Sequence, residues 1–538
     1  MINWKCLCKK LVTFHMLLHK HKTIIFLGLI FLLYLIMSVG IIKYNTINEK
    51  SINFFGIDEY RVLQDMFSIT GNNVNHYRTK VHPLFLLFVQ PVLHIINGLV
   101  HDVGVTVAIA QSIVGITISF CTFCCLKALE VDKKTRVLLT AILTFSFSQI
   151  MFVSNAESFI WGGMATALCW FFSISQMKDA EGLFQGKLLA LFLFLGLLCF
   201  GITITNYIHF VIALVFILRI TSFSFKHKVY LFIKMNCLCL SIASLLNLMQ
   251  FVSWRHKTEL WLKQFYVVIV QKLLSAYEEF PEYIIPFYNE VSQLSFEEAL
   301  YMDFTVSLSK VCVLIEQIFT SSILSRPLVM KELGANYHLV YFNGYYLHSA
   351  FLIFLFFGIF FLSYVYYLNK TMYSSHEYIL LQMLTVALFL NLLLHFIYGA
   401  HEAFMYTPHF LFILFIIYGI ISKYWNSELK RHINLFFVVF LVYEIMVNFY
   451  SYDVMRSFLI EHLSTPPYSM LNVSVGVLYI IFLFCILLYK CYKHKKSFFI
   501  KRAHYFFSVD AAYDLMLCFS FICILSMAFV CIKVFTEY

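Results

Sequence analysis

Residues 23–43 read TIIFLGLIFLLYLIMSVGIIK, an almost wholly apolar run that ends in a lysine. A helix of roughly 20 apolar residues is long enough to cross the hydrocarbon core of a bilayer. The basic residues before the run are Lys5, Lys9, Lys10, Lys20 and Lys22. A secretory signal peptide also starts with basic residues, but this run is too long for one and has no small-residue cleavage site. We therefore interpret it as a membrane anchor whose N-terminus lies in the cytoplasm.

The composition of the whole chain agrees with this interpretation. Of the 538 residues, 61% are hydrophobic and 13% are charged, and the mean hydropathy is +0.81. A soluble chain carries about 25% charged residues, so half of the usual solvating surface is missing. Apolar runs recur along the chain, and we predict an all-α polytopic membrane protein of about 13 transmembrane helices, within a range of about 12–14. The predicted spans are 23–43, 104–127, 137–154, 156–176, 187–201, 204–221, 229–252, 347–368, 378–397, 403–422, 433–451, 473–490 and 511–534.

The positions of the basic residues set the orientation of these spans. Four basic clusters fall on one face if the spans alternate in direction, and cytoplasmic loops are enriched in Lys and Arg. The clusters are Lys133, Lys134 and Arg136; Lys226 and Lys228; Lys423, Lys430 and Arg431; and Lys493, Lys495, Lys496, Lys501 and Arg502. Orientation therefore accounts for the net charge of +10, and no nucleic-acid partner is needed. We expect a multi-pass protein of a bacterial inner or plasma membrane.

Residues 83–100 form an apolar segment that would break this alternation if it crossed the membrane. The segment contains Pro83, Gln90, Pro91, His94 and Asn97, and is polar for a span. We predict a helix that lies at the outer surface or re-enters it.

Two segments then remain on the outer side. The predicted organisation is a basic tail at 1–22, an N-terminal transmembrane module at 23–252 with a first outer loop at 44–82, a long outer loop at 253–346, and a C-terminal transmembrane module at 347–538. The long loop mixes carboxylates with aromatic residues, which favours short amphipathic helices. Loops of this length are usually functional.

The first outer loop carries the residues best suited to chemistry. Asp58 and Glu59 are adjacent carboxylates just beyond the first span. A carboxylate can take the proton from an attacking hydroxyl group. The cationic candidates in the same loop are Arg61, Arg78, Lys80 and His82. Fixed cations can bind a leaving phosphate and stabilise its growing charge. The alternative for an acidic pair in an outer loop is ordinary solvated charge.

The layout resembles the GT-C superfamily of membrane glycosyltransferases, which includes the protein O-mannosyltransferases and the aminoarabinose transferase of lipid A. In that superfamily an acidic motif follows the first span, and a Lys-Pro-Pro-Leu-like element opens the next helix. Here Asp58-Glu59 matches the first motif, and Lys80-Val81-His82-Pro83-Leu84 is similar to the second. The pattern continues at Phe147-Ser148-Gln149 and at Asn155-Ala156-Glu157-Ser158. The resemblance covers roughly the first 170 residues in order, by motif and spacing.

The resemblance implies a sugar donor carried on a polyprenyl phosphate and an acceptor in the envelope, either a glycan or a lipid. Asp58 would activate the acceptor hydroxyl, with inversion at the anomeric carbon, and Glu59 would assist. The donor-phosphate and substrate contacts would come from Arg61, Arg78, Lys80 and His82. No nucleotide-binding motif is evident in the sequence, and the family chemistry needs none. No cofactor is certain, although a divalent metal could take part.

Two later stretches add candidate substrate-binding residues. Glu157 lies at the outer end of a predicted span, where an acid is costly unless it is paired or used, and where it could also simply anchor the helix end. The second stretch contains His401, Glu402, Tyr406 and His409 between two spans. If that stretch is helical, residues three or four apart share a face. The alternative is an ordinary belt of interfacial aromatic rings, and His and Glu here could also bind a divalent metal.

Other functions remain open on the sequence alone. An envelope polysaccharide polymerase or ligase would share the spans and the large outer loop. A lipid-linked glycan transporter would show broken spans and midplane charges, whereas the charges here lie mostly at span ends. A non-catalytic membrane assembly factor fits the composition as well.

Overall fold

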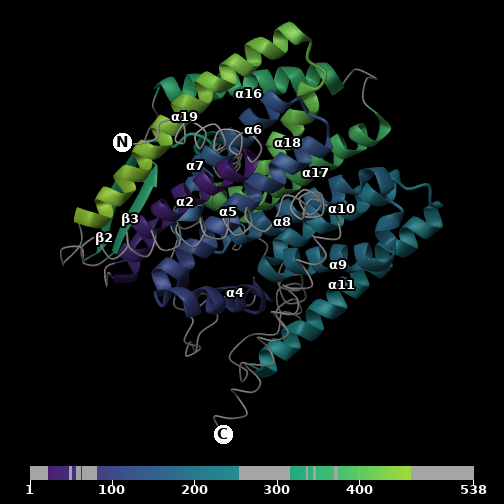
Figure 1. The fold of residues 1–538 in the computed structure, drawn as a ribbon, viewed down its shortest axis with the longest axis horizontal. Helices are drawn as coiled ribbons and strands as arrows, with labels where there is room; N and C mark the ends of the chain where they lie inside the picture. The colour runs from purple at the N-terminus through teal and green to yellow at the C-terminus, as the bar shows by residue number, and fades with distance from the viewer. Residues whose placement is uncertain are drawn as a thin grey trace, which may run out of the picture.

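The computed structural model describes residues 22–47, 51–55, 62–63, 82–253, 315–334, 337–342, 347–368, 374–398 and 400–461. These residues are mostly helical (Figure 1). The α-helices are α2 (Lys22–Ile47), α4 (Phe85–Val100), α5 (Val103–Ala128), α6 (Lys133–Phe145), α7 (Phe147–Ser154), α8 (Phe159–Ser175), α9 (Gly186–Ile202), α10 (Tyr207–Ile220), α11 (Phe225–Ser253), α16 (Leu347–Leu368), α17 (Ser375–Tyr398), α18 (Leu411–Ser422) and α19 (Ser427–Glu461). The 3₁₀-helices are η2 (Met177–Asp179), η3 (Gly182–Phe184), η4 (Ile204–Asn206) and η7 (Ala400–His409), and η6 (Glu316–Ser321) is a π-helix.

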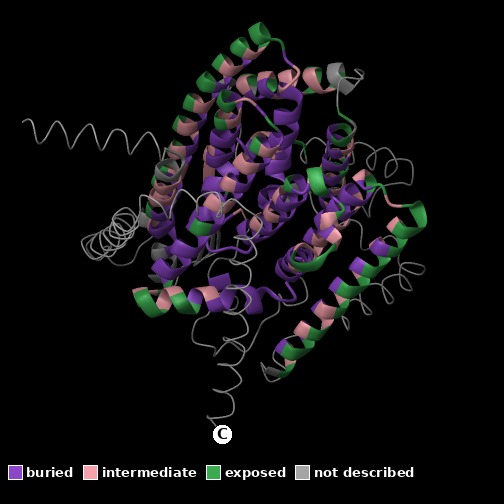
Figure 2. Cartoon of the chain, turned by 45° about the vertical axis from the view of Figure 1, so that its right-hand side comes forward, coloured by how far each residue is buried: buried purple, intermediate pink, exposed green. Residues whose placement is uncertain are grey.

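Several of these helices are suited to a bilayer. Among the described residues, four helices are long and apolar enough to cross a membrane: Val103–Ala128, Phe225–Val252, His376–His395 and Ser427–Leu459. A fifth is formed if α6 and α7, which are bent by 47° relative to each other, make one span. The outward faces of α11 and α19 expose large apolar side chains, as Figure 2 shows. A soluble protein rarely leaves apolar faces of this size in water, so these helices contact lipid.

Most predicted spans coincide with single helices where the structure describes them. The span at 137–154 is instead bent between α6 and α7, and the span at 403–422 begins in the 3₁₀-helix η7. The run at 23–43 lies inside α2, 104–127 inside α5, and 229–252 inside α11. The predicted spans at 473–490 and 511–534 fall outside the described residues. The total of about 13 crossings therefore stays a prediction.

Local capping explains where the helices begin. Asp102 and Asp132 precede α5 and α6, and each side chain accepts a hydrogen bond from a backbone N–H in the first helical turn, at 2.9 and 3.1 Å. Ser146 lies at the bend between α6 and α7, and its hydroxyl accepts from the N–H of Gln149. Short polar side chains at these positions satisfy amide groups that a helix start leaves without partners.

A small sheet joins the two predicted outer segments, which the prediction of an all-α chain missed. β1 (Ser51–Phe54) pairs in parallel with β3 (Tyr337–Phe342), from Ser51 opposite Tyr337 to Phe54 opposite Val340. β2 (Leu328–Gly334) pairs with β3 in the antiparallel sense. The sequence of β3, YHLVYF, is rich in aromatic and branched residues that favour strands. The described part of the long loop therefore contains strands as well as the predicted short helices.

Helix α4 runs across its neighbours instead of alongside them, as Figures 1 and 2 show. Its first half, from Phe85 to Pro91, is buried, whereas Ile95 and Leu99 near its end are exposed. The prediction that this helix lies at the outer surface of the membrane or re-enters it stays a prediction.

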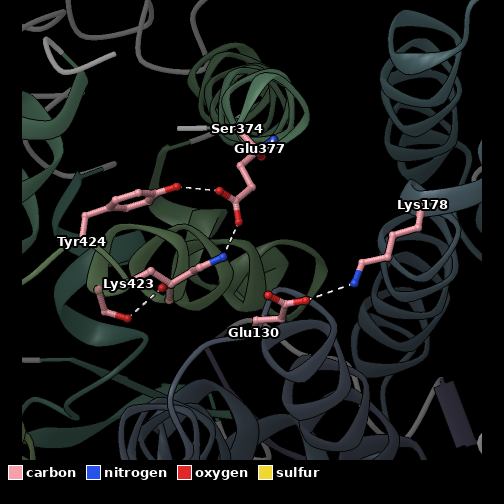
Figure 3. A network of polar contacts seen from close by, with 8 residues as sticks. Glu130, Lys178, Ser374, Glu377, Lys423 and Tyr424 are labelled. Atoms are coloured by element: carbon pink, nitrogen blue, oxygen red, sulfur yellow. Dashed lines mark hydrogen bonds and ion pairs between the residues drawn. The ribbon is translucent and has the colours of Figure 1, made fainter. Parts of the chain in front are cut away.

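Successive helices run in opposite directions, so their connections gather at two ends of the bundle. We define the charged end by residues 129–136, 175–187, 219–228, 374–377 and 422–431, and the histidine end by residues 82–84, 154–162, 202–209 and 395–410. At the charged end, Lys178 contacts Glu130 at 3.0 Å, Lys430 contacts Asp132 at 3.5 Å, and Lys423 pairs with Glu377 (Figure 3). Three of the four predicted basic clusters lie at this end, and the fourth lies outside the described residues.

Candidate functional site

The segment His82-Pro83-Leu84 is held at the histidine end by two helices. The Leu84 N–H donates to the carbonyl of Gly201 at 2.9 Å, at the end of α9. The carbonyl of Pro83 accepts from the side-chain amides of Asn247 and Gln250 on α11, at 3.1 and 3.0 Å. A proline carbonyl with two side-chain donors is firmly placed, so α9 and α11 fix the start of α4.

His82 itself is buried and orients its ring on the end of α9. Its Nδ1 lies within hydrogen-bonding distance of the carbonyl of Ile202 and 3.2 Å from the hydroxyl of Thr203. A carbonyl can only accept, so Nδ1 of His82 carries a proton that points toward Ile202. The ring of His82 also packs edge-on against Phe85.

Glu157 lies in the short break between α7 and α8 and is 1% exposed. Its Oε2 accepts from the N–H and the hydroxyl of Ser158, at 2.8 and 3.3 Å. A carboxylate there also interacts favourably with the N-terminal end of the α8 dipole. The amide of Gln111 on α5 donates to the carbonyls of Asn155 and Glu157, at 3.0 and 2.9 Å. The carboxylate of Glu157 is thus buried inside the bundle at the break between α7 and α8, and Gln111 of α5 binds the backbone of that break.

The stretch containing Tyr406 and His409 is a 3₁₀-helix, η7, and not an α-helix. Residues three apart share a face in a 3₁₀-helix, and the rings of Tyr406 and His409 lie 5.9 Å apart. The prediction that positions 402 and 406 share a face assumed an α-helix, and the side chain of Glu402 lies outside the description. Thr407 binds the hydroxyl of Ser148 at 2.7 Å, and the His409 carbonyl accepts from Thr166 at 2.8 Å.

Gly162 on α8 marks the centre of the site. A Cβ atom at this position would lie 2.4 Å from Nε2 of His409 and 2.6 Å from Nδ2 of Asn206. The two nitrogen atoms are therefore no more than 5.0 Å apart, the sum of these distances. Both are buried, and neither has a hydrogen-bond partner among the described residues. Only glycine leaves room for the two side chains to approach the helix at this point.

His395, at the end of α17, extends this set of unpartnered nitrogens. Its ring stacks on Tyr406 with a centroid separation of 4.3 Å, and neither of its nitrogens has a partner in the described structure. His82, His209 and His395 all lie within electrostatic range of His409. A buried polar group without a partner costs about 1–3 kcal/mol, so each such group requires an explanation. A bound molecule with hydroxyl or phosphate groups would provide the missing partners.

His209 differs from the other buried histidines because its ring is satisfied. Nδ1 accepts from the indole N–H of Trp170 at 3.2 Å, and Nε2 lies 3.0 Å from the amide of Asn391. We interpret His209 as a structural residue that supports the site from α10.

An aromatic cluster joins η7 to the residues that follow β1. Phe55, Phe147, Phe342 and Phe404 pack together, with ring centroids between 4.5 and 6.1 Å apart. Phe404 belongs to η7, and Phe55 follows β1 with a φ of 58° after its N–H has donated to the Val340 carbonyl. Asp58 comes three residues after Phe55 in the sequence.

The structure brings together three predicted site residues: His82, Tyr406 and His409. Glu157 lies two residues before Phe159, whose ring contacts both Tyr406 and His409. His401 and Glu402 belong to η7, and their side chains are outside the description. Asp58, Glu59, Arg61, Arg78 and Lys80 lie outside the described residues.

The sequence analysis missed Asn206 and His395. Their sequence positions carried a usable signal: both are polar residues within or beside apolar spans, where such side chains are costly and usually functional.

The described residues contain no candidate site for the divalent metal that the sequence left open. No group of three or more His, Cys, Asp or Glu side chains in them could hold a metal ion. The cysteines of α5 at positions 121, 124 and 125 are free thiols at buried or half-buried positions.

Comparisons of the chain with protein-family models, with curated proteins and with solved structures find no match.

Proposed function

We propose that this protein is an integral membrane glycosyltransferase of the GT-C type, which transfers a sugar from a polyprenyl-phosphate donor to an envelope glycan or lipid with inversion. One observation carries the proposal. Residues from three separate predicted motifs lie at the histidine end, where buried nitrogens have no partner among the described residues. The motifs begin at Lys80, Asn155 and Tyr398 and are far apart in the sequence.

The chemistry of such a transfer divides between the first outer loop and the histidine end. Asp58 takes the proton from the acceptor hydroxyl, and Glu59 positions it. The cations of the loop stabilise the phosphate as it leaves, and His82 adds a contact from the start of α4. Asn206, His395 and His409 offer hydrogen bonds to hydroxyl groups of the sugar or to phosphate oxygens.

The distribution of charge supports an extracytoplasmic site. The three basic clusters that the structure describes lie at the charged end, and the proposed site lies at the histidine end. By the positive-inside rule the charged end faces the cytoplasm. The donor lipid then reaches the site from within the membrane, between helices that contact lipid.

Asp58→Asn is the test of this proposal. Loss of the general base should reduce sugar transfer by about 10²–10⁴-fold, because the amide cannot accept the proton. The assay measures transfer of labelled sugar from a lipid-linked donor in vesicles that contain the purified protein. Asp453→Asn is the matched control, because Asp453 is an exposed carboxylate on α19. Wild-type rates in Asp58→Asn, with comparable insertion, would reject the assignment.

A lipid-linked glycan transporter is the second candidate, and Glu444 favours it. This acid is fully buried at the midpoint of a membrane-spanning helix, where transporters often place coupling residues. The same vesicle assay separates the two functions. A transporter moves the lipid-linked sugar to the other leaflet without cleaving the sugar–phosphate bond, whereas a transferase releases the polyprenyl phosphate.

A further inference from the structure

Glu444 is a buried acid that the proposed transfer reaction does not use. It is the eighteenth of the 35 residues of α19, and its exposed fraction is 0%. Neither Oε1 nor Oε2 has a hydrogen-bond partner in the part of the chain that the structure describes. One helical turn later, by contrast, the side-chain amide of Asn448 makes three hydrogen bonds. It donates to the carbonyls of Phe145 and Ile323 and accepts from the N–H of Ser325.

Among the described residues, the elements that pack against α19 supply one titratable neighbour of Glu444. Helix α19 packs against α2, α6, α7 and β2, and its Phe437 and Phe440 contact Phe356 of α16. Tyr34, at the centre of α2, is close enough for the charge of Glu444 to act on its phenol group. Helix α7 carries no titratable residue, and the described side chains of β2 are Leu328, Val329 and Met330. The charged residues of α6 begin beside Lys430, which is about 21 Å along α19 from Glu444 at 1.5 Å per residue.

These surroundings favour the protonated form of the acid over the ionised carboxylate. Moving a carboxylate from water to an apolar interior without a partner costs far more than a protein's whole stability, so the group takes up a proton instead. Even the neutral acid is more costly at this place than leucine would be. An acid inside a membrane-spanning bundle is by default a functional group.

A row of hydroxyl groups begins at Tyr34. Its phenol donates to the carbonyl of Thr144 at 2.5 Å and also hydrogen-bonds to Ser119. The hydroxyl of Thr144 donates to that of Ser119 at 2.9 Å. Three hydroxyls from α2, α5 and α6 are therefore joined next to the buried acid, and each can pass a proton to the next by rotating.

We propose that Glu444 is a reversible proton-binding site inside the helix bundle and that the row Tyr34–Ser119–Thr144 forms the first part of the path by which its proton exchanges with water. The ligand is a proton, and the site is separate from the histidine end. The inference does not depend on the proposed sugar transfer, and it holds for a transporter as well.

Infrared difference spectroscopy tests the protonation state directly. The protein in lipid vesicles should show a carbonyl band of a protonated carboxylic acid that disappears in Glu444→Gln and loses intensity as the pH is raised. Glu428→Gln, which removes an exposed acid from the same helix, should leave the band unchanged. Absence of the band at every pH, or a band that persists unchanged to the pH of unfolding, would overturn the proposal.

The second measurement requires no variant at position 444. Dicyclohexylcarbodiimide partitions into the bilayer and adds to a protonated carboxyl group, and the resulting acylurea increases the mass of the peptide by one reagent molecule. Peptide mass spectrometry should find this addition at Glu444 in the wild type, with less modification at alkaline pH. Equal modification at acid and alkaline pH would show a permanently neutral acid and would contradict reversible binding.

The exchange route is tested by transfer to D₂O, which shifts the carbonyl band when the acid exchanges its proton. Tyr34→Phe should slow that shift, because it removes the first hydroxyl of the row. Tyr452→Phe is the matched control, since its phenol joins α19 to α2 by donating to the carbonyl of Met37. Equal exchange rates in Tyr34→Phe and the wild type would mean that these hydroxyls serve only in helix packing, and would reject the route.

Discussion

The charged end and the histidine end handle buried and half-buried polar groups in opposite ways. At the charged end, Glu377 is paired with Lys423 and accepts from Tyr424 at 2.5 Å, as Figure 3 shows. The hydrogen bond and the charge of Lys178 also lower the pKa of Glu130 below its ordinary value. At the histidine end, His395, His409 and Asn206 are buried with nitrogens that have no partner among the described residues.

This difference separates stability from function. Polar groups that are paired within the chain contribute to the folded state and need nothing else. Polar groups that are buried without partners make the ligand-free fold less stable, and a fold keeps such groups where a ligand completes them. We therefore expect substitutions at the charged end to alter stability alone, and substitutions at the histidine end to alter activity.

The largest expected effect comes from Gly162→Ala. The added methyl group would collide with His409 and Asn206, at 2.4 and 2.6 Å, and would displace both from the site. Overpacking of this kind lowers the free energy of unfolding by about 1–3 kcal/mol. Sugar transfer should fall by about 100-fold, because a displacement of about 1 Å in a reactive site has that consequence. Thermal unfolding in detergent and the vesicle assay measure the two effects.

Gly419→Ala is the matched substitution in the last turn of α18, next to the charged end. Its methyl group would lie 2.2 Å from Leu126, so a similar loss of stability is expected. Its rate of transfer per folded molecule should be unchanged. Equal losses of activity in the two variants would show that the histidine end has no special role.

His395→Phe should show opposite signs for stability and activity. Phenylalanine keeps the stacking on Tyr406 and removes two buried nitrogens that have no described partner. The free energy of unfolding of the ligand-free protein should rise by about 1–3 kcal/mol, and sugar transfer should fall. A less stable variant with normal transfer would contradict the role given to His395.

Asp132→Ala tests the charged end at a helix cap. Loss of the hydrogen bond to the Thr135 N–H should lower the free energy of unfolding by about 1 kcal/mol. Asp132→Asn should retain most of this stabilisation, because asparagine can also accept the hydrogen bond. Burial would raise the pKa of Asp132, but Thr135 and Lys430 outweigh it and leave the pKa below its ordinary value of 3.8.

A lowered pKa in the folded state fixes the direction of the pH dependence. The stabilisation by Asp132 is complete above the ordinary carboxyl pKa and is lost as the pH falls through the lowered folded value. Thermal unfolding of the wild type and Asp132→Asn should therefore converge on acidification. Unfolding temperatures that differ by the same amount at every pH would exclude ionisation as the source.

The sequence predicted the helices well because apolar length and charge at the ends are local properties. The runs at 23–43 and 104–127 needed only composition to be placed. The pairing of β1 with β3 could not be predicted, since it joins segments about 290 residues apart and depends on which strands meet. The sequence alone shows Glu444 as an acid within an apolar run. That its carboxylate has no partner among the described residues could be seen only from the tertiary contacts.

The candidate site shows the same limit. His82, Glu157, Tyr406 and His409 could be selected because their residue types suit phosphate and sugar chemistry. That Gly162 brings His409 close to Asn206 depends on three elements packing together, and no local pattern encodes it.

The smallest expected effect is at the exposed pair of Lys178 and Glu130, whose side chains are 78% and 69% exposed. Water and salt screen such a pair, and fixing two mobile side chains offsets the attraction. Lys178→Gln should leave the unfolding temperature unchanged. Lys423→Gln removes the partner of Glu377, a mostly buried carboxylate, and should lower the unfolding temperature measurably. If both variants unfold like the wild type, the charged end is held by apolar packing, and its ion pairs serve orientation in the membrane instead of stability.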